Sequence, residues 1–325
     1  MPSSAARTMQ PAAPTDHSVL RSAGASRRPP SGWWVACWRE LRPHQWIKNV
    51  LVFVPLAAVH GLFDRARLEL CLLGFAAFCL AASSIYVLND LIDLEDDRHD
   101  PQKLDRPLAT GAMHTRTAWL LQTLLLASAC AVAWQLPHHF ISVLIAYYLL
   151  MCVYSLLLKR IVVADIFILA CGYSLRVAAG AALLQIRPSA WLIALCGSLF
   201  MSFALLKRYA ELMARQSAPD GGVLRGYRAA DAPILAVQGI ASGYLSVLVL
   251  ALYTTTDLFR RAYGRQQLFW LLCALLLYWI NYMWLMARRG RIPHDPITFA
   301  LRDRTSALLI AAMAATALLG QWLRP

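Results

Sequence analysis

About nine apolar blocks dominate this sequence, and each is long enough to cross a membrane as a helix. They lie at roughly 46–62, 68–89, 117–135, 140–158, 162–184, 190–211, 232–253, 267–287 and 305–322. A run of about 20 apolar residues spans the roughly 30 Å hydrocarbon core of a bilayer. Only 15% of the residues are charged, which is too few to solvate the surface of a globular protein. The chain is therefore predicted to be an all-α polytopic membrane protein, with no soluble catalytic domain of ordinary size.

The net charge of +13 does not indicate a nucleic-acid partner, because the basic residues sort by loop. With the helices placed as above, 23 of the 31 Lys and Arg residues fall in the N-terminal region and the even-numbered loops, against seven on the other side and Arg176 inside a helix. Cytoplasmic loops carry the excess of positive charge. This predicts a cytoplasmic N-terminus and an outward C-terminus.

Two further patterns concern the N-terminal tail and the cysteines. Residues 1–32 are rich in Ala, Ser, Pro and Arg and are predicted to form a disordered cytoplasmic tail, with one transmembrane catalytic domain over 33–325. Seven of the eight cysteines lie inside apolar blocks without a CxxC pair. They are predicted to fill the core as thiols, not to form disulfides or a zinc site.

The acidic residues carry the most specific signal. Seven of the 18 Asp and Glu residues lie within sixteen positions at the end of the second block. On a continuous helix, Asp90, Asp93 and Asp97 share one face at i, i+3 and i+7, with Asn89 beside them. Because like charges on one helical face repel, this arrangement indicates a bound divalent cation. Mg²⁺ prefers such oxygen ligands and is commonly completed by substrate phosphates. The alternative is a solvated acidic loop.

Cationic and other polar residues lie at further helix ends on the same predicted side. Lys103 and Arg106 follow the acidic cluster directly, and cations of this kind bind phosphate oxygens. The other candidates end or begin neighbouring helices: Lys48, Asn49, Tyr154, Lys159, Lys207, Arg208 and Glu211. For the lysines, anchoring at the membrane interface is the alternative role.

Two ionisable residues lie in the fifth apolar block, Asp165 near its start and Arg176 eleven residues later. A charged group at that depth indicates a function by default. Gly172 and Gly180 flank Arg176 at four-residue intervals, which allows neighbouring helices to approach closely. Two roles remain open for Arg176, to hold the bundle together or to contact a substrate, and the first is preferred.

The stretch NDLIDLEDDRHDPQKLDRP fits the NDxxDxxxD signature of the UbiA superfamily of intramembrane prenyltransferases, which the chain resembles over nearly all of its length after the tail. Five further stretches resemble the decaprenyl-phosphate phosphoribosyltransferase branch: LRPHQWIKN, YSLLLK, ADIFILACGYSLRVAAGA, LLKRYAEL and DPITFALRDR. The chain departs from the members that prenylate aromatic compounds, because KRYAE stands where their second DxxxD motif is found.

This resemblance implies a nine-helix bundle with a cavity facing the cytoplasm, Mg²⁺ as cofactor, phosphoribosyl diphosphate as donor and a polyprenyl phosphate as acceptor. The three aspartates would then hold Mg²⁺ on the diphosphate, and the Lys, Arg and Tyr residues named above would bind phosphate oxygens. A homo-oligomer is possible. Two other functions stay open: prenyl transfer from a polyprenyl diphosphate to a small acceptor, and cation transport, which is disfavoured because transporter sites usually lie near the bilayer midplane.

Overall fold

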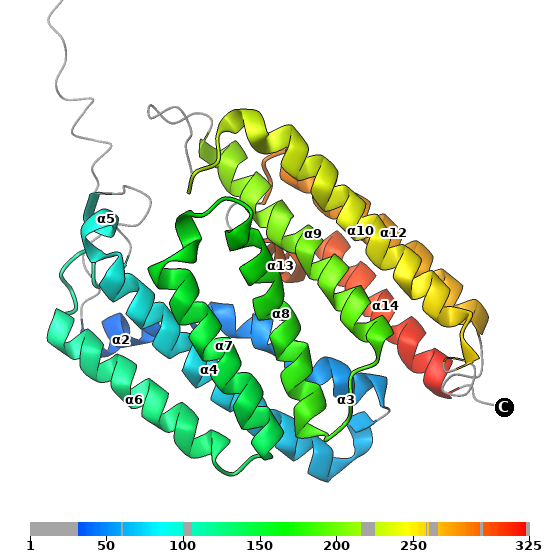
Figure 1. Cartoon of the computed structure of the whole chain (residues 1–325), viewed down its shortest axis with the longest axis horizontal. Coiled ribbons are helices and arrows are strands. Elements are labelled where there is room, and N and C mark those ends of the chain that lie inside the picture. The colour runs from blue at the N-terminus through cyan, green and yellow to red at the C-terminus, as the bar shows by residue number, and fades with distance from the viewer. Residues whose placement is uncertain are drawn as a thin grey trace, which may run out of the picture.

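The structure, a computed structural model, describes residues 32–59, 61–99, 106–215, 225–257, 259, 266–292 and 295–322. Its regular elements are helices (Figure 1). The first half contains α2 (Trp33–Leu41), η1 (Pro43–Phe53), α3 (Val54–Ala58), η2 (Gly61–Phe63), α4 (Arg65–Ile92), α5 (Leu94–His99), α6 (Thr115–Ala133) and α7 (His138–Leu156). The second half contains η3 (Leu158–Arg160), α8 (Ala164–Leu183), α9 (Ala190–Arg215), η4 (Ala229–Asp231), α10 (Ala232–Thr254), α12 (Gln266–Arg288), α13 (Pro296–Arg302) and α14 (Arg304–Trp322).

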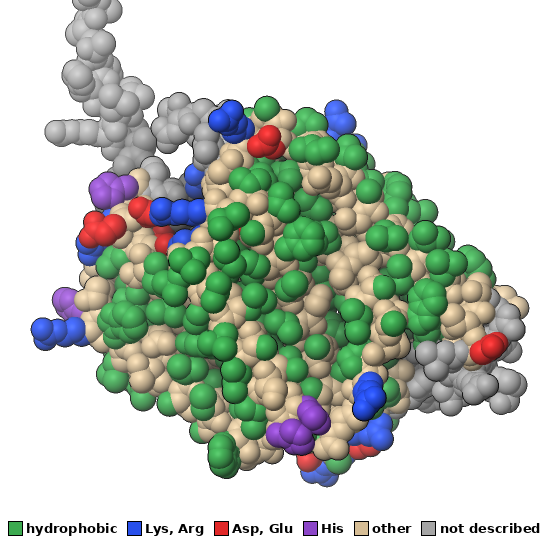
Figure 2. All heavy atoms as spheres, in the orientation of Figure 1, with side chains coloured by type: hydrophobic (Ala, Val, Ile, Leu, Met, Phe, Trp, Pro, Cys, Tyr) green, Lys and Arg blue, Asp and Glu red, His purple; other side chains and the backbone are tan. Residues whose placement is uncertain are grey.

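The membrane-protein prediction is confirmed, but the count of nine spans is not. Within the described ranges, seven helices are long and apolar enough to cross a bilayer, or up to eight if α13 and α14 form one span bent by 86°. In Figure 2, hydrophobic side chains cover the middle of the visible face, while charged and His side chains gather toward two opposite ends. This distribution is expected of a bundle surrounded by lipid.

The first predicted helix, 46–62, is wrong as a single α-helix. The chain instead forms the 3-10 helix η1 followed by the short helix α3. Pro55 explains part of this break, because it has no backbone N–H to donate to a carbonyl one turn earlier. Since a 3-10 helix rises about 2.0 Å per residue and an α-helix 1.5 Å, the two elements together rise about 30 Å.

Helix α8 joins two packed halves of the bundle (Figure 1). Its first half packs into a hydrophobic cluster with α9, α10 and α12, through Ile166, Ala170 and Tyr173. Its last turns belong to a second cluster formed with α3, α4 and α7, through Ala179 and Leu183. Both halves therefore contribute helix ends to one shared region.

The close approach between α8 and η1 depends on Gly180. A Cβ at this position would lie 2.0 Å from the carbonyl oxygen of Val52, whereas a Cβ at Gly197 in α9 would meet no heavy atom within 4 Å. We expect Gly180→Ala to lower the free energy of unfolding by about 1–3 kcal/mol through overpacking. Gly197→Ala is the matched control and should be neutral or stabilising, because Ala favours helices. Thermal unfolding in detergent measures both; equal stability of the two variants would contradict this packing.

Candidate active site

A cavity of about 860 Å³ lies among the ends of helices from both halves of the bundle. Its size is within the range of small-molecule and cofactor sites, which is roughly 300–1,000 Å³. Eight Lys and Arg residues line it: Arg39, Arg42, Lys48, Arg106, Arg176, Lys207, Arg215 and Arg225. Four carboxylates accompany them: Glu40, Asp90, Glu211 and Asp295. This excess of positive charge suits an anionic ligand.

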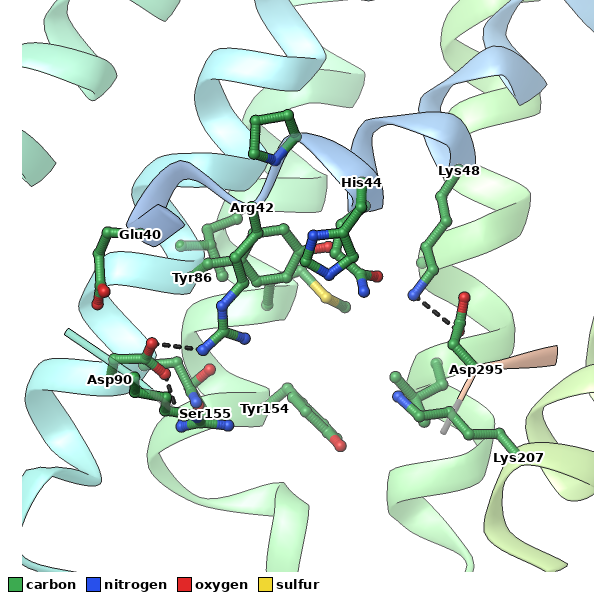
Figure 3. A pocket seen from close by; sticks show the side chains of 18 of the residues that line it. Glu40, Arg42, His44, Lys48, Tyr86, Asp90, Tyr154, Ser155, Lys207 and Asp295 are labelled. Atoms are coloured by element: carbon green, nitrogen blue, oxygen red, sulfur yellow. Dashed lines mark hydrogen bonds and ion pairs between the residues drawn. The ribbon is translucent and has the colours of Figure 1, made fainter. Parts of the chain in front are cut away.

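Six of the charged residues lie in two groups on opposite sides of the cavity (Figure 3). Glu40, Arg42 and Asp90 lie on one side, and Lys48, Asp295 and Lys207 lie on the other. We name them the acidic-motif group and the lysine group. The side chain of Tyr154 is drawn between them. The cavity therefore offers two separate places for charged parts of one ligand.

The acidic motif keeps its helical geometry across a turn. Helix α4 ends at Ile92, yet the N–H of Asp93 donates to the carbonyl of Asn89 at 2.9 Å, and the N–H of Asp97 donates to the carbonyl of Asp93 at 2.8 Å. These bonds maintain the i to i+4 pattern. The three aspartates thus stay on neighbouring turns, as the continuous helix predicted.

Each of these aspartates contacts a cationic side chain. Arg42 pairs with Asp90, and Nη1 of Arg106 donates to both Asp90, at 2.7 Å, and Asp97. Lys159 pairs with Asp93. Asp90 and Asp97 are nearly fully buried, at 1% exposure each. Their oxygens therefore converge on one positively charged nitrogen.

This convergence fits the binding of a divalent cation. Carboxylate oxygens are the ligands that Mg²⁺ prefers, and Mg²⁺ is usually held by one or two carboxylates together with waters and substrate phosphates. Among the residues that the structure describes, no three His, Cys, Asp or Glu side chains are grouped closely enough to hold a metal ion. A metal ion here would be held by fewer than three of these side chains, with waters and ligand phosphates completing its coordination.

The lysine group is built by three distant parts of the chain. Nζ of Lys48, in η1, lies 2.9 Å from Oδ1 of Asp295, and Asp295 also caps α13 by accepting from the N–H of Thr298 at 3.1 Å. Burial opposes the ionisation of Asp295, but Lys48 and Lys207 outweigh it and lower its pKa to about 2. Nζ of Lys207 lies farther from its partner, at 4.0 Å from Oε1 of Glu211.

Arg208 does not line the cavity, although it follows Lys207 directly. Its guanidinium pairs with Asp165 and Glu211, and Arg208 and Asp165 are 1% and 0% exposed. The hydroxyl of Tyr227 donates to Asp165 at 2.7 Å and accepts from the N–H of Val163 at 2.6 Å. This buried network joins α8, α9 and the segment before α10.

Arg176 serves the bundle and also reaches the cavity. It donates to the side-chain oxygen of Asn49 at 2.8 Å, to the carbonyl of Gly172 at 2.6 Å and to the hydroxyl of Tyr147 at 2.8 Å. Its guanidinium lies 4.6 Å from the centre of the Tyr147 ring. The arginine therefore connects η1, α7 and α8, and it is also one of the cavity-lining residues.

Eight of the fifteen predicted site residues line the cavity. They are Lys48, Asn89, Asp90, Arg106, Tyr154, Arg176, Lys207 and Glu211. Asp93, Asp97 and Lys159 belong to the adjoining ion pairs, and Asn49, Asp165 and Arg208 lie in the buried networks. Lys103 lies outside the described residues. The chemical roles of all fifteen stay predictions.

Six charged residues of the cavity wall were not among the predicted site residues: Arg39, Glu40, Arg42, Arg215, Arg225 and Asp295. Arg42 and Asp295 lie in stretches that carried the family resemblance, LRPHQWIKN and DPITFALRDR, so a signal for them was present in the sequence. No sequence signal marked Glu40, because it precedes the first apolar block. Arg225 pairs with the hydroxyl of Tyr154, a contact that no sequence spacing indicates.

Known proteins resemble the chain in sequence. A model of the UbiA prenyltransferase family matches residues 50–302. The uncharacterized protein y4nM of Sinorhizobium fredii is 35% identical over 304 residues; the match covers 91% of this chain and 59% of that protein. The nodulation protein NoeC of Azorhizobium caulinodans is 33% identical over 84% of this chain and 89% of its own length. The decaprenyl-phosphate phosphoribosyltransferase of Mycobacterium tuberculosis is 31% identical over 89% and 95%.

The fold is also shared with solved structures. A UbiA homolog from Archaeoglobus fulgidus bound to DMAPP and Mg²⁺ superposes with a TM-score of 0.64, covering 88% of this chain and 99% of the other. Sequence identity is 18%, so this likeness concerns the fold. The sequence and structural matches agree: the chain belongs to the UbiA prenyltransferase family and is a membrane transferase.

Proposed function

We propose that this protein transfers the 5-phosphoribosyl group from phosphoribosyl diphosphate to a polyprenyl phosphate, with Mg²⁺, and releases diphosphate. The observation that carries the proposal is the separation of the acidic-motif group from the lysine group within one cavity. The donor likewise has two separate anionic parts, a diphosphate and a 5-phosphate. Relatives named decaprenyl-phosphate phosphoribosyltransferase, at 31–40% identity, support the same reaction.

Each charged group would bind one end of the donor. Asp90, Asp93 and Asp97 would hold Mg²⁺ on the diphosphate, where the cation neutralises charge that builds up on the leaving group. Arg42 and Arg106 lie beside these carboxylates and would bind diphosphate oxygens. The lysine group would bind the 5-phosphate, placing the ribose ring near Tyr154.

The chemistry is a substitution at ribose C1. The bond from C1 to the diphosphate oxygen breaks, and a lipid phosphate oxygen forms the new bond to C1. A phosphate monoester has a second pKa of about 6 and is largely ionised near neutral pH, so no protein base is required. The site therefore works through positioning and charge, in agreement with its Lys and Arg residues.

A groove beside the cavity suits the lipid acceptor. Its volume is about 420 Å³, and Pro43 and His44 belong to both it and the main cavity. Most of its other lining residues are apolar, among them Ile47, Val50 and Leu301, all of them exposed on the surface. An acceptor tail in this groove would keep its hydrocarbon toward the lipid and its phosphate near His44.

We further propose the predicted orientation, with the cavity and N-terminus cytoplasmic, the C-terminus outward and the protein in the bacterial inner membrane. The loops rich in Lys and Arg support it, because such loops are retained in the cytoplasm. Prenyl transfer to a small acceptor is the second candidate, supported by homologs solved with DMAPP or GPP.

A donor lacking the 5-phosphate tests the assignment of the lysine group. We expect ribose 1-diphosphate to be a poor donor for the wild type, and Lys207→Ala to reduce kcat/KM for phosphoribosyl diphosphate by roughly tenfold to a hundredfold. This range corresponds to a charged hydrogen bond of about 1.5–3 kcal/mol. With ribose 1-diphosphate the substitution should have little effect. Equal losses with both donors would contradict this placement of the 5-phosphate.

A further inference from the structure

The carboxylate of Glu40 is buried in the cavity wall, and no donor among the described residues reaches it. Glu40 belongs to α2, is 1% exposed and lines the cavity. Neither of its carboxylate oxygens accepts a hydrogen bond from a donor among the described residues, and the hydrogen-bonding group beside it is the carboxylate of Asp90. Figure 3 shows the side chain on the same side as Asp90, which comes from α4. Two helices therefore bring two carboxylates to one side of the cavity.

The charges around Glu40 do not balance. Arg42 and Arg106 are the neighbouring cations, and both are already paired with Asp90 or Asp97. Three carboxylates thus share two guanidinium groups, and Glu40 is the one that forms an ion pair with neither of them. An ionised carboxylate is strongly destabilised in such a buried place unless a cation is beside it.

The carboxylates of Glu40 and Asp90 lie within hydrogen-bonding reach of each other, although neither can donate a hydrogen bond when both are ionised. A divalent cation would supply the positive charge that the surrounding side chains do not.

We infer that Glu40 is a further ligand of the divalent cation and binds it together with Asp90, from outside the acidic motif. This inference rests on the proposed use of a cation at Asp90. Two carboxylates completed by phosphates and waters are a common way to hold Mg²⁺. Because the ligands come from α2 and α4, cation binding would also fix α2, and with it Arg42, against the site.

Binding of Mn²⁺ in the absence of any donor tests this role. The purified full chain in detergent is titrated with Mn²⁺, and free Mn²⁺ is measured by electron paramagnetic resonance. We expect Glu40→Gln and Asp90→Asn each to weaken Mn²⁺ binding by at least about tenfold. The reason is that removal even of outer-sphere partners costs roughly 10–100-fold in metal affinity. Glu95→Gln is the matched control, because Glu95 is an exposed residue of the acidic segment; it should bind as the wild type does.

Thermal unfolding separates a metal ligand from a residue that only supports the fold. In EDTA, Glu40→Gln should unfold at the wild-type temperature or above it, because the variant removes an unpaired buried carboxylate. Added Mn²⁺ should raise the unfolding temperature of the wild type more than that of the variant, since a ligand stabilises the state that binds it. A variant less stable in EDTA, with an undiminished response to Mn²⁺, would overturn the inference.

Wild-type Mn²⁺ affinity in Glu40→Gln, combined with weak binding in Asp90→Asn, would also overturn it while leaving the proposed reaction intact. Conversely, the binding measurement contains no donor, so a different donor preference would not change its outcome. Failure of the wild type to bind Mn²⁺ would overturn both the role of Glu40 and the proposed cation site.

Discussion

Asp90→Asn is expected to lower turnover by roughly two orders of magnitude or more, because it removes an anionic ligand from the proposed Mg²⁺ site. The expectation follows from metal sites in which even outer-sphere partners are worth 10–100-fold. In this structure Asp90 also pairs with Arg42 and Arg106, so the substitution leaves both guanidinium groups with less negative charge around them. Initial rates over a range of Mg²⁺ concentrations measure the effect.

Asp96→Asn is the matched control for this experiment. Asp96 belongs to the same acidic segment, but its ion pair with Arg160 is largely exposed, at 65% and 72%. Exposed pairs contribute about 0–1 kcal/mol, so activity and stability should remain close to those of the wild type. Full activity of Asp90→Asn, or undiminished wild-type activity after EDTA treatment, would contradict the role of the acidic motif.

Arg208→Ala is expected to destabilise the protein severely, by about 3–5 kcal/mol, because it leaves the buried carboxylate of Asp165 without its cation. Asp165 would retain only the hydroxyl of Tyr227 among the partners described above. The adjacent substitution Lys207→Ala is the matched control. Since Lys207 lines the cavity and has one distant partner, its loss should affect donor binding and leave the unfolding temperature nearly unchanged.

Thermal unfolding in detergent, followed by Trp fluorescence, distinguishes the two neighbours. Arg208→Ala should unfold well below Lys207→Ala. Equal unfolding temperatures, with equal losses of donor affinity, would show that both side chains bind the donor, as the sequence alone predicted. Such a result would contradict the buried network described here.

The contrast between Lys207 and Arg208 shows what the sequence could predict and what it could not. Both residues follow an apolar helix at the predicted cytoplasmic end, and that placement made both candidates for phosphate binding. Successive residues on a helix point in directions about 100° apart, at 3.6 residues per turn. Which of the two faces the cavity depends on the packing of α8 against α9, and the local sequence around these residues does not indicate that packing.

The helices themselves were largely predictable, because the length of each long apolar block can be compared directly with the thickness of the bilayer. The first block was misjudged as one α-helix: it is divided into η1 and α3, with Pro55 at the start of α3 and a close approach of η1 to α8 at Gly180. Only part of the lysine group was predicted from the sequence. Lys48 was a candidate because it lies at a helix end, whereas its partner Asp295 is distant in the sequence and was not a candidate. Contacts between segments that are distant in the sequence were the part of the site that only the structure revealed.

The most direct test of the proposed reaction is the identity of its lipid product. Purified protein is incubated with Mg²⁺, a polyprenyl phosphate and labelled phosphoribosyl diphosphate, and in parallel with a polyprenyl diphosphate and 4-hydroxybenzoate; lipids are analysed by mass spectrometry. We predict a polyprenyl-phosphate phosphoribose in the first reaction, together with released diphosphate, and no prenylated product in the second. A prenylated aromatic product, with no transfer of the phosphoribosyl group, would contradict the proposal and establish prenyl transfer as the function.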